Sequence, residues 1–232
     1  MRSRHSPDRA ELSPSLGKKC DQHSSAAFLL ACLVLAVTAS CTPPSVVNRL
    51  AFHPERVPET FPPPSGMAVD EIYLASADST RLHALYFPSD TRRVVLYLHG
   101  NGGHAFHRLN DAAALAETGT SVLLLGYRGY GKSEGAPSEQ GMYADGRAAL
   151  EYLQQVAGFS REHTFVLGRS IGSAIAVHIV QDEPIAGLIL IAPLSNGRDM
   201  ANHLGFGWLS WLFGHPFDST TKISRVEAPT LF

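Results

Sequence analysis

The chain has 232 residues, of which 44% are hydrophobic and 17% are charged, and its formal net charge is −2. This balance is typical of one sizeable globular domain and excludes the strongly basic class of nucleic-acid-binding proteins. The three cysteines all precede residue 42, and neither H-E-x-x-H nor C-x-x-C occurs, so we expect no disulfide, no metal site and no cofactor.

Residues 1–41 are typical of a leader that ends in a signal peptide. Lys18 and Lys19 precede an uncharged apolar run over 26–39, which has the length of a signal-peptide core and is short for a membrane span. The residues Thr38-Ala39-Ser40-Cys41 resemble the lipobox of bacterial lipoproteins. We therefore expect Cys41 to be lipidated and to anchor the protein to a membrane of a bacterial cell envelope. The alternatives are cleavage after Ala39, which would give a secreted or periplasmic protein, and an uncleaved anchor.

A proline-rich segment over residues 42–66 separates this leader from the domain that we expect over residues 67–232. The segment holds seven of the fifteen prolines. Because proline lacks a backbone donor and restrains the residue before it, we expect an extended tether or an irregular strap across the domain.

The domain alternates predicted strands and helices. Two runs at its start, Asp70–Ala75 and Arg81–Phe87, alternate polar and apolar residues as half-exposed antiparallel strands do. Continuous apolar runs predict further strands over Val94–Leu98, 121–126, 164–167 and 186–192, with helices over 106–119, 142–156 and 171 to about 181. This order predicts an α/β fold with a mostly parallel, doubly wound sheet and an antiparallel N-terminal edge.

One serine lies where a predicted strand meets a helix. The segment Gly168-Arg169-Ser170-Ile171-Gly172 follows an apolar strand and leads directly into a helix-forming run. A sharp turn of this kind exposes the serine hydroxyl, and the small glycines relieve the crowding that the turn creates. The N–H group of Ile171, at the start of the helix, can then bind a developing oxyanion. The alternative is that Ser170 only caps the helix.

A glycine-rich loop, His99-Gly100-Asn101-Gly102-Gly103, follows the strand Val94–Leu98. Such a loop can bring a second backbone N–H group to an oxyanion, and we select Asn101 for this role. Phosphate binding is the alternative, but neither G-K-[ST] nor G-x-G-x-x-G occurs here. We expect His99 to be a structural ring that is hydrogen-bonded beneath the loop, not the catalytic base.

These residues resemble the α/β-hydrolase-fold serine hydrolases, in the branch of depalmitoylase-like and serine-aminopeptidase-like domain proteins. The similarity runs from about residue 46 to 232 through RLHALYFP, LYLHGNGG, GYRGYGKSEGAPSEQ, GRSIGSAIA and GLILIAPLSNGRDMA. One departure is Asp78-Ser79, where the family usually has Asp-Gly in the front hairpin. The resemblance implies that Ser170 forms an acyl-enzyme with an ester, thioester or amide, such as a small molecule or an acyl-chain compound. It also implies that the amides of Asn101 and Ile171 form the oxyanion hole.

The resemblance further suggests which residues wall the site, namely His99, Gly100, Tyr127, Arg128 and Arg169. For the loop 127–131, an equal alternative is a glycine-rich turn that is stabilised by Arg128 and the tyrosines. Aromatic residues farther along are expected either to line an acyl pocket or to pack the core of a cap helix; they are Phe206, Trp208, Trp211 and Phe213.

In this family the catalytic acid follows the next strand and the histidine follows the strand after that, and the sequence here ends at APTLF, which is predicted to open that next strand. We therefore expect a fragment of a longer product that lacks the last strands of the fold; a degenerate hydrolase and a domain completed by another chain are the alternatives. Asp199 with His203 or His215 has the expected chain order, but Asp199 and His203 are predicted to share a solvated helix face. Asp218 and His178 are weaker candidates. The alternative function is a non-catalytic envelope protein that binds a hydrophobic ligand or partner.

Overall fold

The computed structural model describes residues 48, 51–57, 66–203, 205 and 216–232, all within one compact unit. Within these residues the main sheet has the strand order β2-β3-β6-β4-β7-β8-β9. Its strands are β2 (Asp70–Ala75), β3 (Arg81–Phe87), β4 (Val94–Leu98), β6 (Ser121–Leu125), β7 (Thr164–Arg169), β8 (Gly187–Ile191) and β9 (Thr230–Leu231). Pairing is antiparallel for β2 with β3 and for β3 with β6, and parallel from β6 to β9. The predicted fold class, a mostly parallel sheet with an antiparallel N-terminal edge, is confirmed.

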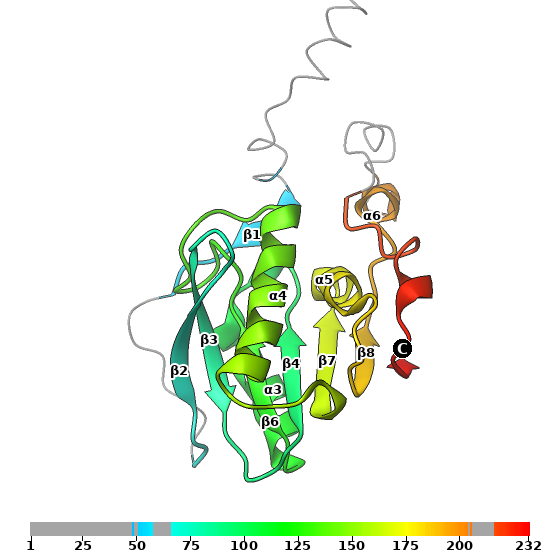
Figure 1. Ribbon diagram of the computed structural model, residues 1–232. Coiled ribbons are helices and arrows are strands. Elements are labelled where there is room, and N and C mark those ends of the chain that lie inside the picture. The colour runs from blue at the N-terminus through cyan, green and yellow to red at the C-terminus, as the bar shows by residue number, and fades with distance from the viewer. Residues whose placement is uncertain (1–47, 49–50, 58–65, 204, 206–215) are drawn as a thin grey trace, which may run out of the picture. The chain divides into compact units, whose positions relative to one another are not determined.

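Helices cover both faces of this sheet (Figure 1). On one face lie α4 (Glu139–Gln155) and α5 (Ile171–Val180), and their apolar residues share one buried cluster with the strands. On the other face α3 (Leu109–Glu117) packs against residues of β4 and β6 in a second cluster. The strands β4 and β6 are buried along their whole length. This is why both appear in the sequence as unbroken apolar runs rather than as alternating ones.

The remaining short elements are β1 (His53–Pro54), β5 (Gly102–Gly103), η1 (Ala105–Arg108), η2 (Arg161–His163), α6 (Gly197–His203) and η4 (Ile223–Arg225). Two boundaries differ from the sequence-based prediction. The helix predicted over 106–119 begins as the 3-10 turn η1 and only then becomes α3. The helix predicted from residue 142 begins at Glu139, because the Ser138 hydroxyl accepts a hydrogen bond from the Gly141 N–H group (3.2 Å) and caps it.

Residues 51–57 of the proline-rich segment form a strap across the domain. Phe52 is buried in the core and packs edge-on against Phe217. The strand β1 pairs in parallel with β5, and Arg56 forms a single bridge with Gly131. The described part of the segment is therefore packed on the domain, as the strap interpretation predicts.

The hairpin between β2 and β3 explains the departure noted at Asp78-Ser79. Ser79 has a φ of 64°, which lies in the left-handed region that favours glycine. Glycine at this place would thus adopt the same turn without the steric cost. The substitution affects this hairpin turn alone, because the strands on either side keep their full pairing from Asp70–Tyr86 to Ala75–Arg81.

Candidate functional site

Ser170 lies in a sharp turn between β7 and α5 at the carboxyl edge of the parallel strands. Its φ and ψ are 53° and −121°, a conformation that non-glycine residues seldom adopt and that is concentrated at functional sites. The Ser170 N–H group donates to the Ile191 carbonyl (2.9 Å) at the end of the neighbouring strand β8. The residue is partly exposed. The strained backbone is therefore anchored to the sheet, and the residue is partly accessible from solvent.

The two flanking glycines are required by close backbone packing. A Cβ atom at Gly172 would lie 2.6 Å from the His99 carbonyl oxygen and closer still to that of Leu98. A Cβ atom at Gly168 would lie 2.5 Å from the Gly172 carbonyl oxygen. Real Cβ atoms do not approach backbone oxygens so closely, so the first turn of α5 can sit against β4 and β7 only with glycine at both positions.

The glycine-rich loop 99–103 lies beside this turn. It leaves β4, which pairs with β7 in the register Leu98 to Gly168, so both loops emerge from the same edge of the sheet. A Cβ atom at Gly100 would lie 3.5 Å from the Cβ atom of Ser170. Ile171 is the first residue of α5, and its N–H group has no acceptor within the helix. The structure thus brings Gly100 together with Ser170 and Ile171. Asn101 is part of the same group because it directly follows Gly100 in the chain.

The Asn101 side chain ties the loop to the strap. Its amide nitrogen donates to the Ala51 carbonyl (2.7 Å), and its oxygen accepts from the His53 N–H group (3.3 Å) and from the Tyr130 hydroxyl (2.8 Å). These three bonds fix the backbone of Asn101, which the sequence suggests as an oxyanion donor. The sequence offers no sign that the asparagine side chain has this separate role.

His99 is a buried structural ring beneath the loop. Its Nδ1 donates to the Gly100 carbonyl oxygen (2.7 Å), and its ring contacts that of Tyr127 at 4.5 Å. Burial lowers the pKa of His99 to about 4, which keeps the ring neutral. Tyr127 is also fully buried, and its hydroxyl donates to the His99 carbonyl oxygen (2.9 Å). Both residues therefore support the loop from below instead of lining an open wall.

Arg128 binds one buried carboxylate and one exposed carboxylate. Its guanidinium donates to the fully buried Asp145 (2.7 Å) and to Asp78 in the front hairpin (2.8 Å). These ion pairs join the loop 127–131 to α4 and to the hairpin, which matches the turn-stabilising alternative. The guanidinium also holds the pKa of the Asp78 carboxyl well below its ordinary value through hydrogen bonding.

Arg169 is the exposed cation next to the nucleophile candidate. Its guanidinium lies 3.4 Å from the Asp111 carboxylate on α3, which also accepts a hydrogen bond from the Tyr97 hydroxyl (3.1 Å). Both members of the ion pair are about 45% exposed, so solvent screens the attraction between them. Of the five wall candidates, Gly100 thus lies beside Ser170, and Arg169 lies at the surface edge of the site. The other three, His99, Tyr127 and Arg128, are supports.

Ser173 contributes to the structure of the Ser170 turn, and the sequence-based reasoning missed it. Its hydroxyl donates to the Ser170 carbonyl (2.5 Å) and accepts from the Leu194 N–H group (2.8 Å). It therefore links the strained turn to the loop after β8. A serine in the first turn of the helix after the strand is the signal that could have pointed to it, because short hydroxyl side chains bond to nearby backbone there.

The histidines and acids that the sequence offers within the chain are engaged elsewhere. Asp199 accepts from the Ser195 hydroxyl (2.7 Å) and the Asn196 amide (2.8 Å), and its partner in the proposed pair, His203, is exposed at the end of α6. His178 stacks on Tyr143 with ring centroids 3.6 Å apart. Asp218 accepts from Thr220 and Thr221. Over the ranges that the structure describes, no histidine is hydrogen-bonded to the Ser170 hydroxyl.

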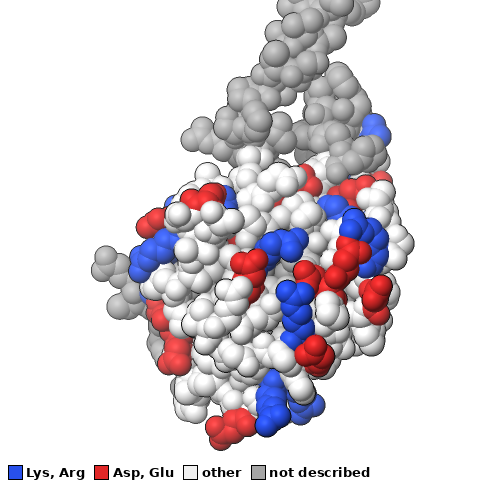
Figure 2. All heavy atoms as spheres, viewed as in Figure 1, with Lys and Arg blue, Asp and Glu red and all other residues white. Residues whose placement is uncertain are grey.

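Several predicted features lie outside the described residues, namely Cys41, His215 and the aromatic set Phe206, Trp208, Trp211 and Phe213. Searched over the described part of the chain, no helix is both long and apolar enough to cross a membrane. Acidic and basic side chains are interspersed on the face that Figure 2 shows.

One group of described side chains has the composition of a metal-binding set. It consists of Glu55, His104 and His107, whose ligand atoms all lie within 4.8 Å of one another. The sequence-based expectation of no metal site rested on familiar spacings and overlooked this H-x-x-H pair.

Comparisons with known proteins agree with this geometry. A family model described as serine aminopeptidase, S33, matches residues 89–227, which is more than half of the chain. The Arabidopsis thaliana α/β hydrolase domain-containing protein WAV2 is 31% identical over 70% of this chain and 59% of its own length. The Danio rerio lysophosphatidylserine lipase ABHD12 is 36% identical over 60% of this chain and 41% of its own length. The chain therefore spans less than two thirds of the length of these curated relatives.

Solved structures confirm the fold independently. The Pyrococcus furiosus esterase Pf2001 matches 78% of this chain and 75% of its own chain with a TM-score of 0.63, at 19% sequence identity. At this level of identity the likeness concerns the fold alone. Together with the family match, it establishes that the chain belongs to the serine aminopeptidase S33 family of α/β hydrolases.

Proposed function

We propose that this protein is a serine hydrolase in which Ser170 attacks a carbonyl carbon and forms an acyl-enzyme. The observation that carries the proposal is the strained conformation of Ser170 between two glycines that backbone packing requires. A chain that used Ser170 only as a helix cap would have no need of a positive φ at that residue. In agreement with this, the Ser170 side chain makes no capping hydrogen bond to the helix.

In the proposed reaction the Ser170 oxygen bonds to the carbonyl carbon of the substrate as a base removes the hydroxyl proton. The carbonyl oxygen becomes an oxyanion, which accepts hydrogen bonds from the N–H groups of Ile171 and Asn101. The intermediate then expels the alcohol, thiol or amine, which takes up a proton, and leaves the acyl group on Ser170. Water attacks this ester in the same way and releases the acid.

We propose an ester as the first substrate class to test, with thioesters and amides as further classes. Support comes from one of the similar proteins, the Danio rerio lysophosphatidylserine lipase ABHD12. Its name denotes hydrolysis of a carboxylic ester. The family name refers to peptide bonds, and for this reason amides stay within the proposal.

None of the described histidines considered from the sequence, which are His99, His178 and His203, is the base in this proposal. His99 is neutral, buried and bonded to Gly100, and His178 on α5 stacks on Tyr143 of α4. His203 lies at the exposed end of a short helix whose acid, Asp199, is bound to Ser195 and Asn196. This agrees with the family resemblance, which places the base later in the chain order than all three.

The test is covalent labelling with a fluorophosphonate, in which an activated serine oxygen bonds to phosphorus and fluoride leaves. We expect labelling of the wild-type protein and none of Ser170→Ala. The matched control is Ser160→Ala, which removes a serine hydroxyl at the opposite end of β7 and should label normally. Hydrolysis of a p-nitrophenyl ester should fall in Ser170→Ala and stay at the wild-type rate in Ser160→Ala. Labelling that survives Ser170→Ala refutes the proposal, and an unlabelled but folded wild-type protein favours the non-catalytic alternative.

A further inference from the structure

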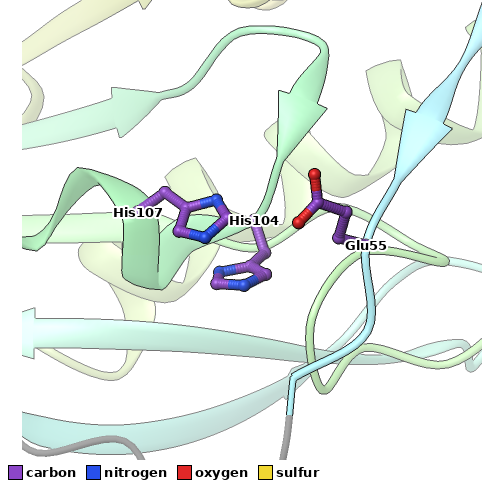
Figure 3. A group of neighbouring side chains, drawn as sticks. All are labelled: Glu55, His104 and His107. Carbon is purple, nitrogen blue, oxygen red and sulfur yellow. The ribbon is translucent and has the colours of Figure 1, made fainter.

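Glu55, His104 and His107 converge where the strap crosses the loop after β4 (Figure 3). One ring nitrogen of each histidine and one carboxylate oxygen lie within 4.8 Å of one another. His104 is buried, whereas His107 and Glu55 are exposed. Neither the hydrolase reaction nor the packing of the sheet requires this combination of residues.

The local backbone brings the two histidines together. His104 caps η1 and His107 lies within it, and the His107 N–H group donates to the His104 carbonyl (3.1 Å). In a 3-10 turn the side chains at i and i+3 lie on the same side. The two rings accordingly stack with centroids 3.8 Å apart. Gly103, with a φ of 82°, leaves open the space that the His107 ring occupies.

Glu55 reaches the two rings through long-range strand pairing. The strand β1 pairs with β5 in the register His53 to Gly102 and Pro54 to Gly103. The Glu55 N–H group donates to the Gly103 carbonyl (3.3 Å), and its own carbonyl accepts from the Gly131 N–H group (2.8 Å). The Glu55 backbone is thus fixed on both sides, and the carboxylate is brought beside the rings.

The charges of the three groups suit a cation. The neutral form of an imidazole binds metal through a ring nitrogen, and a carboxylate supplies a negative charge that offsets the charge of the ion. Glu55 supplies the carboxylate here, and the ligand atoms of all three residues lie within 4.8 Å of one another.

We propose that Glu55, His104 and His107 bind one divalent transition-metal ion of the Zn²⁺ type, which cross-links the strap to the loop after β4. Two imidazoles and one carboxylate are an established three-ligand set for zinc, with water in the fourth position. Bond lengths of about 2.0–2.1 Å to a tetrahedral ion place the donor atoms about 3.3 Å apart, so the group must contract on binding. Because a ring nitrogen binds an ion in the plane of its ring, the His107 ring must also turn out of its stack on His104. The side chains of Glu55 and His107 are exposed, which allows both movements.

The consequence of metal binding is a more rigid connection at the loop that carries Asn101. That loop is already joined to the strap by the Asn101 side chain and by β1–β5 pairing. A bound ion would add a third link only three residues from Asn101 along the chain. We therefore expect the ion to slow local opening of the strap, an effect that is separate from bond cleavage at Ser170.

The test measures binding in the full chain and requires no catalytic activity. Zn²⁺ titration by calorimetry should give one site whose affinity falls at least about 10-fold in His107→Ala and in Glu55→Gln, as loss of even an outer-shell partner does at metal sites. Both substitutions are at exposed residues, so the fold should be retained. The control His163→Ala removes an exposed histidine from η2 and should leave the affinity unchanged.

Two further readouts locate the ion. Co²⁺ in place of Zn²⁺ should give visible bands without a sulfur-to-metal charge-transfer band, which excludes the cysteines as ligands. Amide hydrogen exchange at Glu55 and Gly131 should slow on addition of Zn²⁺ in the wild-type protein and not in His107→Ala. The proposal is overturned by affinities equal to that of the wild type in both variants, by a thiolate band that accounts for the bound ion, or by unchanged exchange at the strap.

Discussion

The substitution Gly172→Ala tests whether backbone packing at the start of α5 holds the serine turn. In an ordinary helix position, alanine is more favourable than glycine by about 1 kcal/mol. At residue 172 the added Cβ atom would lie 2.6 Å from the His99 carbonyl oxygen and closer to that of Leu98. Leu98 ends β4, which is paired on both sides by β6 and β7, so its carbonyl cannot move away without disturbing the sheet.

The expected loss of stability follows from these two opposing effects. Overpacking of a well-packed site costs about 1–3 kcal/mol, and contacts with two fixed backbone oxygens place this site at the upper end. Subtracting the helix advantage of about 1 kcal/mol leaves a net loss of about 2 kcal/mol in the free energy of unfolding. Because the first turn of α5 must shift, fluorophosphonate labelling of Ser170 should also slow.

The assay is urea unfolding of the variant beside two other glycine-to-alanine variants. In Gly146→Ala on α4, the new Cβ atom meets Cγ2 of the buried, β-branched Ile175 at 2.8 Å, so overpacking offsets the helix advantage of alanine and we expect a smaller loss than at Gly172. In Gly102→Ala the Cβ atom meets nothing within 4 Å, and stability should be unchanged. The reasoning is refuted if Gly172→Ala unfolds at the same urea concentration as the wild type while these controls behave as stated.

Two other predictions concern buried ionisable groups. Asp145→Asn should lower the free energy of unfolding by about 3 kcal/mol, because it leaves the guanidinium of Arg128 buried with only Asp78 as an anionic partner. The matched change Asp182→Asn breaks the exposed ion pair with Arg225 and should lower the free energy of unfolding by less than about 1 kcal/mol, measured by the same urea titration. His178 has its pKa lowered to about 4, first by burial and then by the charge of Lys222. The unfolded chain protonates this histidine near its ordinary value of about 6.5, so stability must fall as pH drops from 6.5 toward 4. In His178→Phe, which keeps the stacking on Tyr143, this fall should be shallower, and an unchanged pH dependence would contradict the assignment.

The sheet was predictable because its strands have distinct burial patterns. The strands β2, β3 and β4 begin and end at the predicted residues. The prediction that β3 is half-exposed was wrong, because five of its seven residues are buried. The short strand β9 forms within the segment that was predicted to open a strand, and it pairs in parallel with β8. Boundaries that depend on local capping, such as the start of α4, differ by a few residues because one serine hydroxyl decides them.

The sharp turn at Ser170 was also predictable, whereas most of its supports were not. Gly168, Ser170 and Gly172 form a contiguous pattern, in which the two glycines permit close backbone packing and Ser170 has a positive φ. By contrast, Arg128 pairs with Asp145 seventeen residues away, and Asn101 bonds to Ala51 fifty residues away. A polar contact between two irregular segments has no periodicity, so nothing in a single sequence indicates which segments meet.

The proposed metal-binding group could not be predicted from the sequence for the same reason, and its formation depends on the strap. The pair His104 and His107 is visible in the sequence, but Glu55 joins it only through pairing of two-residue strands. Short strands of this size have no stability of their own. They persist here because Phe52 is buried in the core and Arg56 donates to the Ser133 carbonyl (2.7 Å).

Residues with a strained backbone lie close to the contacts that support the Ser170 turn. Ser170 and Ala192 both have positive φ, at 53° and 47°, and they follow the adjacent strands β7 and β8 at the same edge of the sheet. Strain of this kind costs about 1–3 kcal/mol per residue and persists only where surrounding contacts over-determine it. The contacts are present, because Ile191 accepts from the Ser170 N–H group and Ser173 joins Ser170 to Leu194. Ligands of parallel α/β sheets bind at the carboxyl ends of the strands, and the two strained residues lie at two such neighbouring ends.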